Sequence, residues 1–205
     1  MKMPFFASFI VFIILVSYEI AKSRRTTAEK ESSFWEKENR ANSTRRKSLD
    51  DLNYIRVPLE DLPMDTMADD ETVSECHQTM RHLAQSPIVN FTGISNTDLK
   101  LRYGAPNIEL LMGYDQNYTT LVRTLQKWAE KLHEAGHTAQ AKQVLEFAVS
   151  TGTDISSTYR LLCQIYKEQH TPEKIGSLYP IAEVLNSAMQ KTIVRILQEA
   201  DQSAD

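Results

Sequence analysis

The sequence predicts an all-α protein in which a single N-terminal transmembrane helix precedes a domain of paired helices. The first observation is an apolar run without charged residues from Pro4 to Tyr18. The second is that, from Asp70 onward, apolar residues recur every three to four positions, which is typical of amphipathic helices. The third is that two such patterns of similar length flank a short turn at Gly136. A content of 41% hydrophobic and 24% charged residues fits one globular domain with an appendage.

Residues 1–21 are predicted to form the transmembrane anchor. The uncharged run reaches Ala21 if Glu19 lies at the membrane boundary, which gives roughly 18 residues, close to the lower limit for a spanning helix. A cleaved signal peptide is the alternative, but the following VSYEIAKSRR stretch is basic and has no small-x-small cleavage site. More Lys and Arg follow the run than precede it, so the positive-inside rule predicts a single-pass cell-membrane protein with a cytoplasmic C-terminal domain.

Residues 22–51 are predicted to be a basic, partly helical juxtamembrane linker. Residues 22–50 hold nine Lys and Arg against five Asp and Glu, whereas residues 51–205 hold thirteen against twenty-one. The basic segment, mainly residues 22–47, suits contact with anionic lipid, although a solvated linker has the same composition. The acidic body has no basic stripe, so we expect no nucleic acid partner. The two cysteines have no CxxC spacing, which excludes a disulfide framework and a structural zinc site.

Residues 52–69 are predicted to form an extended strap. Pro58 and Pro63 exclude a helix interior, while Tyr54, Val57 and Leu62 are too apolar for a free linker. We expect this segment to lie on the folded domain. A docking peptide for another protein is the alternative.

Residues 70–205 are predicted to form the helical domain. Its first helix follows Asp70 and has one apolar face, formed by Val73, Cys76, Met80 and Leu83. Because adjacent helical residues point about 100° apart, we expect Cys76 in the core and His77 at the surface. A short capped helix ends at Gly104, and the segment SAMQKTIVRILQEA is predicted to be a terminal capping helix.

The two patterns around Gly136 recur with a shift of 34 residues. Under that shift Leu125 corresponds to Tyr159, Trp128 to Leu162, Ala129 to Cys163 and Leu132 to Tyr166. The succession of large, small and aromatic positions, a turn glycine and two further small positions resembles the tetratricopeptide repeat over about 70 residues. The second copy departs from the pattern because His170 stands where the turn glycine is expected.

This resemblance implies a stack of helical hairpins, an α-solenoid, with a concave groove for a protein or peptide partner. The groove would be lined by the first helix of each pair, with candidate residues Arg123, Gln126, Glu130, His133, Arg160, Gln164 and Lys167. Arg160 and Lys167 could hold a peptide carboxylate, with help from Arg123. The alternative interpretation is that these residues are only the solvated polar faces of amphipathic helices.

The pentapeptide HEAGH, at residues 133–137, is similar to the zinc-protease signature. Such a site needs both histidines on one uninterrupted helix, whereas the repeat pattern ends the helix near Gly136. No spacing rule selects a third zinc ligand. The sequence also lacks the phosphate-binding loop of an ATPase module, which membrane proteases with this motif carry. We therefore expect no catalysis, no metal and no cofactor.

The sequence thus favours a membrane-tethered scaffold or adaptor without catalytic activity. Two alternatives remain: a zinc metalloprotease using His133, Glu134 and His137, and a structural subunit of a membrane complex. The stretch RRKSLDDLNYIRVPLEDLP also resembles membrane-anchored, uncharacterised bacterial proteins, which implies no activity.

Overall fold

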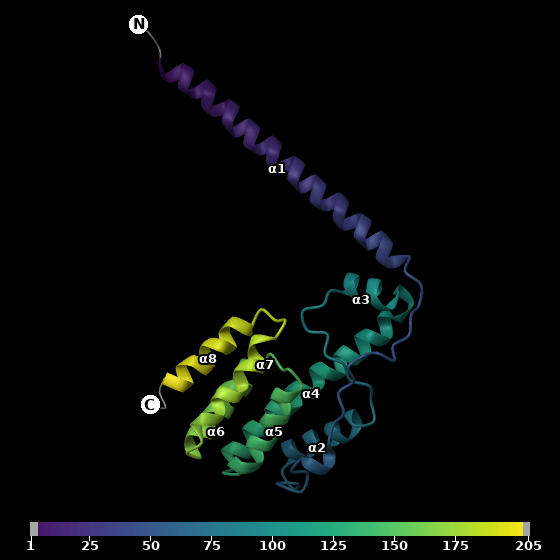
Figure 1. Cartoon of the computed structure of the whole chain (residues 1–205), viewed down its shortest axis with the longest axis vertical. Helices are drawn as coiled ribbons and strands as arrows, with labels where there is room; N and C mark the ends of the chain where they lie inside the picture. The colour runs from purple at the N-terminus through teal and green to yellow at the C-terminus, as the bar shows by residue number, and fades with distance from the viewer. Residues whose placement is uncertain (1–3, 203–205) are drawn as a thin grey trace. The chain divides into compact units, whose positions relative to one another are not determined.

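Every regular element in the part of the chain that the structure describes is a helix (Figure 1). The structure, a computed structural model, describes the backbone of residues 4–202 and the side chains of residues 9–20, 22–23 and 30–202. The α-helices are α1 (Pro4–Asn42), α2 (Glu71–Leu83), α3 (Asn96–Tyr103), α4 (Ile108–Glu134), α5 (Thr138–Ser150), α6 (Ser156–Glu168), α7 (Tyr179–Glu183) and α8 (Gln190–Gln202). Three 3-10 helices lie between them: η1 (Leu59–Asp61), η2 (Ala105–Asn107) and η3 (Pro172–Leu178). An all-α fold was predicted, and this part of the prediction is confirmed.

The transmembrane anchor predicted at residues 1–21 is not supported. Among the described residues, no helix is both long enough and apolar enough to cross a membrane. The single-pass location that rested on this anchor is therefore not supported either.

Parts of two predictions lie outside the described residues. Residues 1–3 of the proposed anchor are not described, nor are the side chains of residues 4–8 and 21. The same holds for the side chains of residues 24–29 in the segment expected to meet anionic lipid. Residues 22–51 were expected to be partly helical, and the part up to Asn42 belongs to α1.

The chain divides into two compact units, and the first consists of residues up to 47 together with residues 95–108. Here the C-terminal part of α1 packs on α3. Lys100 Nζ lies 2.6 Å from Glu38 Oε1, and this hydrogen bond lowers the pKa of the Glu38 carboxyl. Lys37 pairs in the same way with Asp98, at 2.8 Å. Gly104 ends α3 with a φ of 94°, in agreement with the predicted glycine stop.

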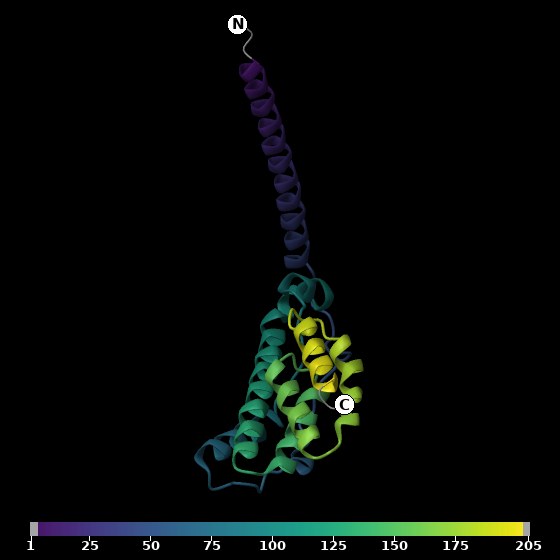
Figure 2. The same cartoon turned by 90° about the vertical axis from the view of Figure 1, so that its left-hand side faces the viewer.

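The second unit, residues 48–94 and 109 onward, contains the helical layer that positions the candidate site. Figures 1 and 2 show α6 beside α8, and α5 packs on the other side of α6. The core is apolar and its largest fully buried side chains come mainly from α4, α5 and α6. They include Leu121, Leu125, Trp128, Leu132, Leu145, Tyr159, Leu162 and Ile165. The apolar faces read from the sequence are therefore the faces that pack.

The proline-containing segment before α2 lies against this core. Val57 and Leu62 of this segment are buried in the core, and η1 forms a short helical turn between them. The Ile55 amide donates to Ile88 O at 2.9 Å, so the segment is also bonded to the loop that follows α2.

Helix α2 has the apolar face that was predicted, but one neighbouring residue was misplaced. Asp70 caps the helix by accepting a hydrogen bond from the Val73 amide at 3.0 Å. Cys76 is buried as expected. His77, expected at the surface, is only 2% exposed and packs edge-on against Trp128, with ring centroids 4.9 Å apart. The angular argument was wrong here because His77 packs against Trp128 of α4, a contact with another helix that a single helix pattern does not reveal.

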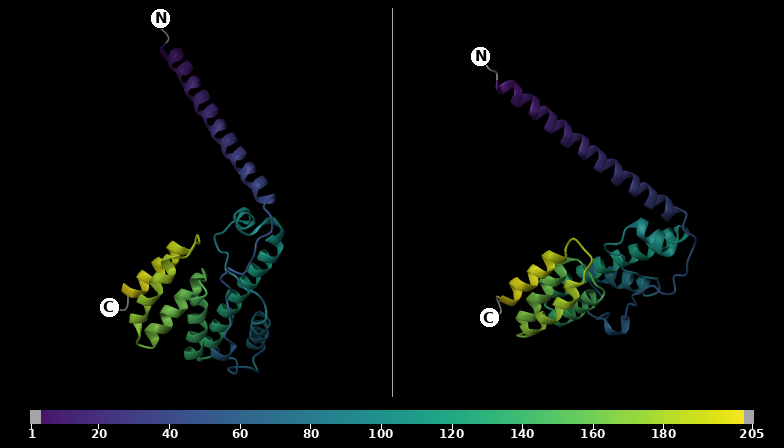
Figure 3. Two further views of the ribbon diagram at one scale, coloured as in Figure 1. Left: turned by 45° about the vertical axis from the view of Figure 1, so that its right-hand side comes forward. Right: turned by 45° about the horizontal axis from the view of Figure 1, so that its top comes forward.

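The turns that end α4 and α6 have the same geometry, 34 residues apart. Gly136 has a φ of 84° and His170 a φ of 55°, both in the left-handed region. The amide after each of them donates to the carbonyl five residues earlier: His137 to Leu132 and Thr171 to Tyr166, both at 2.8 Å. This is the hydrogen bond of a Schellman helix end. Figure 3 shows the chain reversing after α4 and again after α6.

The second helix of the second pair is not a regular helix. In place of a counterpart to α5, the chain forms η3 and the short α7. Pro172 is the first residue of η3 and Pro180 the second residue of α7, and proline is favoured at the first positions of a helix but not inside one. Ile175 and Ala182 are nevertheless buried. The 34-residue shift makes them the counterparts of Ala141 and Ala148 in α5. The helical architecture is clear, but it does not by itself identify a repeat family.

Candidate functional site

A buried hydrogen-bond chain joins α4 to α6 and forms the floor of the candidate site. Gln126, on α4, is 8% exposed. Its Oε1 accepts a hydrogen bond from Thr158 Oγ1 at 2.6 Å, and its Nε2 donates to Glu130 Oε1 at 2.6 Å. Thr158 is fully buried on α6, so this contact fixes the two helices against each other and orients the Glu130 carboxylate.

Two hollows lie one on each side of α6, and the floor borders the first of them through Glu130. The first, which we call the α4/α6 hollow, has a volume of about 320 Å³. It is lined by Glu130, His133, Glu134, Ser157, Arg160, Leu161 and Gln164. The second, the α6/α8 hollow, has a volume of about 390 Å³. It is lined by Arg160, Cys163, Gln164, Lys167, Glu168, Ile196, Glu199 and Ala200.

Arg160 and Gln164 line both hollows and therefore form the ridge between them. We call the two hollows with this ridge the groove. Gln164 is held in place because its Nε2 donates to Glu168 Oε1 at 2.8 Å. Arg160 is exposed, and no hydrogen bond or ion pair engages its guanidinium among the described residues. The groove thus presents an uncommitted arginine at its centre.

His133 is the histidine that lines the α4/α6 hollow. Its Nε2 lies 4.0 Å from Glu168 Oε1, at the limit of an ion pair if the imidazole is protonated. Its Nδ1 is buried and has no partner among the described residues. The ring therefore lines the hollow near the C-terminal end of α4.

The thiol in the α6/α8 hollow is not activated. Burial raises the pKa of Cys163 to about 11, so the group stays protonated near neutral pH. A protonated thiol is a poor nucleophile and a poor metal ligand. Cys163 therefore contributes a small apolar surface to this hollow.

The structure brings together five of the seven residues predicted from the sequence to line a groove. Glu130, His133, Arg160, Gln164 and Lys167 line the two hollows. Gln126 belongs to the floor beside the α4/α6 hollow, and Arg123 is exposed on α4 but lines neither hollow.

The sequence did not predict the wall that α8 contributes. Ile196, Glu199 and Ala200 line the α6/α8 hollow, but α8 was interpreted only as a cap. The available signal was the apolar face of this helix, formed by Ile193, Ile196 and Leu197, which are buried. Residues next to this face, such as Glu199 and Ala200, then lie at the border with α6.

The HEAGH residues do not form one helical face. Helix α4 ends at Glu134, Gly136 has a left-handed backbone, and His137 is the residue before α5. The break in the helix was predicted. In the described part of the chain no group of three or more His, Cys, Asp or Glu side chains is arranged to hold a metal ion.

A third hollow of the second unit has a different lining. It measures about 500 Å³ and is bordered by the loops after α2, α5 and α7. Its lining, all of it without charge, is Asn53, Ile55, Asn90, Thr92, Ser150, Thr151, Gly152, Pro180, Ile181, Val184, Leu185 and Asn186. The Asn90 amide is already engaged, because its Nδ2 donates to the carbonyls of Thr151 and Gly152, both at 3.2 Å. This hollow lacks the free charged groups that distinguish the groove.

The groove thus combines three features: a fixed polar contact between α4 and α6, two hollows, and a central arginine without a partner among the described residues. Comparisons with known proteins found no matching family, no similar curated protein and no similar solved structure.

Proposed function

We propose that the groove binds a peptide segment of a partner protein and that the chain acts as a scaffold or adaptor. The observation that carries this proposal is Arg160, exposed on the ridge between two hollows and without a partner among the described residues. A guanidinium offers five N–H donors in a fixed plane and readily binds peptide carbonyl or carboxylate oxygens. Arginine is also enriched among the residues that dominate protein interfaces.

The rigid floor supports the same proposal. The hydrogen bond between Gln126 and Thr158 holds α4 against α6 without help from a ligand. A preformed groove avoids part of the ordering cost of binding. The hollows, at about 320 and 390 Å³, each have room for one or two side chains. They suit a short extended segment better than a bulky folded surface.

Peptide selection on the purified chain tests the proposal. A displayed library of random linear peptides is selected on the wild-type chain, and dissociation constants of the enriched peptides are measured by fluorescence anisotropy. Because a central interface arginine typically contributes about 2 kcal/mol, we expect Arg160→Ala to weaken binding by at least about tenfold. The matched control is Arg123→Ala, which removes an exposed arginine of α4 that lines neither hollow, and it should change affinity less than twofold.

Two results would contradict the proposal. The first is a library that yields no peptide with measurable affinity. The second is a set of selected peptides that are equally sensitive to both arginine substitutions. Circular dichroism melts of both variants establish that any loss of binding is not a loss of fold.

A further inference from the structure

We infer that the groove selects a segment in which a lysine or arginine stands a few residues from an apolar side chain. This inference rests on the proposed function and adds the chemistry of the ligand. The basic side chain enters the α4/α6 hollow and the apolar side chain enters the α6/α8 hollow. Arg160 donates to backbone carbonyl oxygens between them.

The balance of charge in the groove carries the first step. Four carboxylates line the two hollows, those of Glu130, Glu134, Glu168 and Glu199, against the two fixed cations Arg160 and Lys167. An acidic segment drawn to the two cations would also face these four carboxylates. The groove is therefore a poor receptor for a peptide carboxylate, which was the ligand expected from the sequence.

The α4/α6 hollow is the more acidic of the two. Its only fixed cation is Arg160, whereas Glu130 and Glu134 both border it. Glu130 accepts a hydrogen bond from the neutral amide of Gln126, and no ion pair compensates its charge within the described residues. Glu134 is 69% exposed, and the Lys131 ammonium is 3.9 Å away, at the edge of ion-pair range. An ammonium or guanidinium entering this hollow would form charge-assisted hydrogen bonds with carboxylates that are otherwise solvated.

The α6/α8 hollow has an apolar floor. Cys163 is 2% exposed and Ile196 is 6% exposed, and Ala200 stands one helical turn beyond Ile196. Charged groups of both signs, Lys167 and Glu199 among them, border the opening and balance each other. A leucine, methionine or phenylalanine side chain would remove apolar surface from water here without burying a charge.

Arg160 links the two subsites. It lines both hollows, so its guanidinium faces whatever part of the ligand crosses the ridge. The crossing part of an extended peptide is backbone, and its carbonyl oxygens are acceptors in any sequence. Arg160 therefore contributes affinity, while the two hollows distinguish one side chain from another.

The test compares sequence preference with the effect of neutralising the acidic hollow. The probe is the displayed random peptide library, selected in parallel on the wild-type chain and on the double variant Glu130→Gln, Glu134→Gln. The control variant is Glu173→Gln, an exposed carboxylate outside both hollows. Binders from the wild type should carry Lys or Arg together with an apolar residue. Their affinity should fall at least tenfold on the double variant and less than twofold on the control.

The salt dependence of binding adds a second readout. Binding to the wild type should weaken as ionic strength rises, and the double variant should lose most of that dependence. Enrichment of acidic peptides that still require Arg160 would overturn the inference and leave the proposed function standing. Failure to find any peptide that requires Arg160 would overturn both.

Discussion

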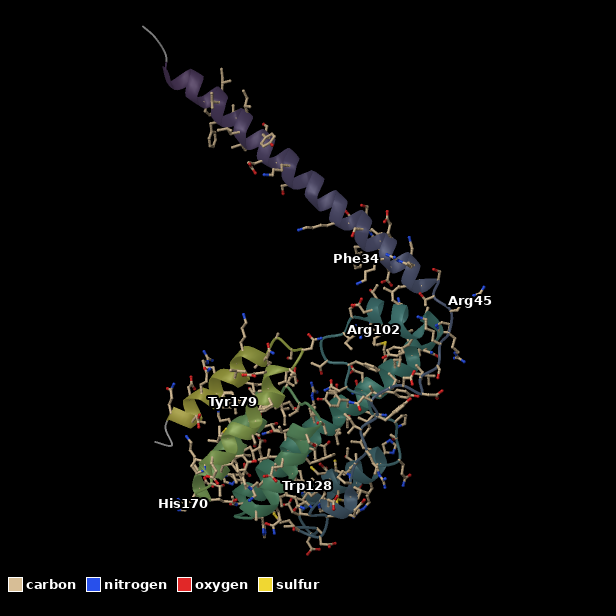
Figure 4. All side chains as sticks on the ribbon, viewed as in Figure 1. Phe34, Arg45, Arg102, Trp128, His170 and Tyr179 are labelled. Atoms are coloured by element: carbon tan, nitrogen blue, oxygen red, sulfur yellow. The ribbon has the colours of Figure 1, made fainter. Side chains whose placement is uncertain are left out.

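The two left-handed turns give the sharpest test of the architecture. Gly136→Ala places a side chain on a backbone with a φ of 84°, and His170→Gly removes one from a backbone with a φ of 55°. The two substitutions should therefore change the free energy of unfolding in opposite directions. Figure 4 labels His170 in the turn that follows α6 and Trp128 among the helices of the second unit.

The magnitude follows from the surroundings of each turn. A Cβ built on Gly136 meets no atom within 4 Å, so its cost is conformational and not steric. A left-handed residue with a Cβ costs about 1–2 kcal/mol, and we expect Gly136→Ala to lower stability by about 1 kcal/mol. His170 already carries that cost. Because glycine also gains freedom in the unfolded chain, His170→Gly should raise stability by a smaller amount, about 0.5 kcal/mol.

Urea unfolding followed by circular dichroism measures these changes as shifts of the midpoint at constant slope. Gly113→Ala is the matched control, because Gly113 lies inside α4 and a Cβ there also meets nothing within 4 Å. In a helix interior alanine is favoured over glycine by about 0.8–1 kcal/mol, so this control should stabilise the chain. If Gly136→Ala stabilised the chain as well, the turn would not be left-handed. Helix α4 would then run on into α5, and the two histidines of HEAGH would share one face.

Three further substitutions test the packing of the second unit. Burial lowers the pKa of His77, so the unfolded chain binds a proton that the folded chain resists, and stability should fall as the pH drops below about 6.5. His77→Phe should flatten that slope in urea titrations between pH 5 and 7, while substitution of the exposed His82 by Gln should leave it in place. Thr158→Val leaves the buried Gln126 oxygen without its donor and should lower the free energy of unfolding by about 1–3 kcal/mol in the same assay. An unchanged urea midpoint would contradict the hydrogen bond between Gln126 and Thr158. Gly93→Ala should lower the free energy of unfolding by at least about 2 kcal/mol, because its φ is 76° and a Cβ would overlap a backbone carbonyl oxygen of the loop after α7. A loss no larger than that of Gly136→Ala would show that this loop is free to move.

Features governed by local chemistry could be predicted from the sequence. Asp70 and Ser95 cap α2 and α3 because a short polar side chain can accept a hydrogen bond from an amide of the first helical turn. The break at Gly136 follows from the glycine that a left-handed helix end favours. The sequence could also place Arg160 and Gln164 on one helix face, because residues three and four apart lie on the same side of a helix.

Features governed by tertiary contacts could not be predicted in this way. The burial of His77 depends on Trp128, a residue of another helix about 50 positions away in the chain. The α8 wall of the groove depends on how a terminal helix packs on α6, which no repeat pattern specified. The apolar run near the N-terminus predicted a membrane-spanning helix from composition alone, and the described part of α1 does not support it.

Helix α8 forms the far wall of the α6/α8 hollow. After α6 the chain forms η3 and the short α7 in place of a long second helix, and α8 then packs beside α6. Arg195 and Glu199 of α8 lie 3.7 Å apart and both are more than two-thirds exposed, and Glu199 also borders the α6/α8 hollow. In the proposed function the two hollows and the ridge form the recognition surface, so specificity should come from two side chains of the ligand and the short backbone between them.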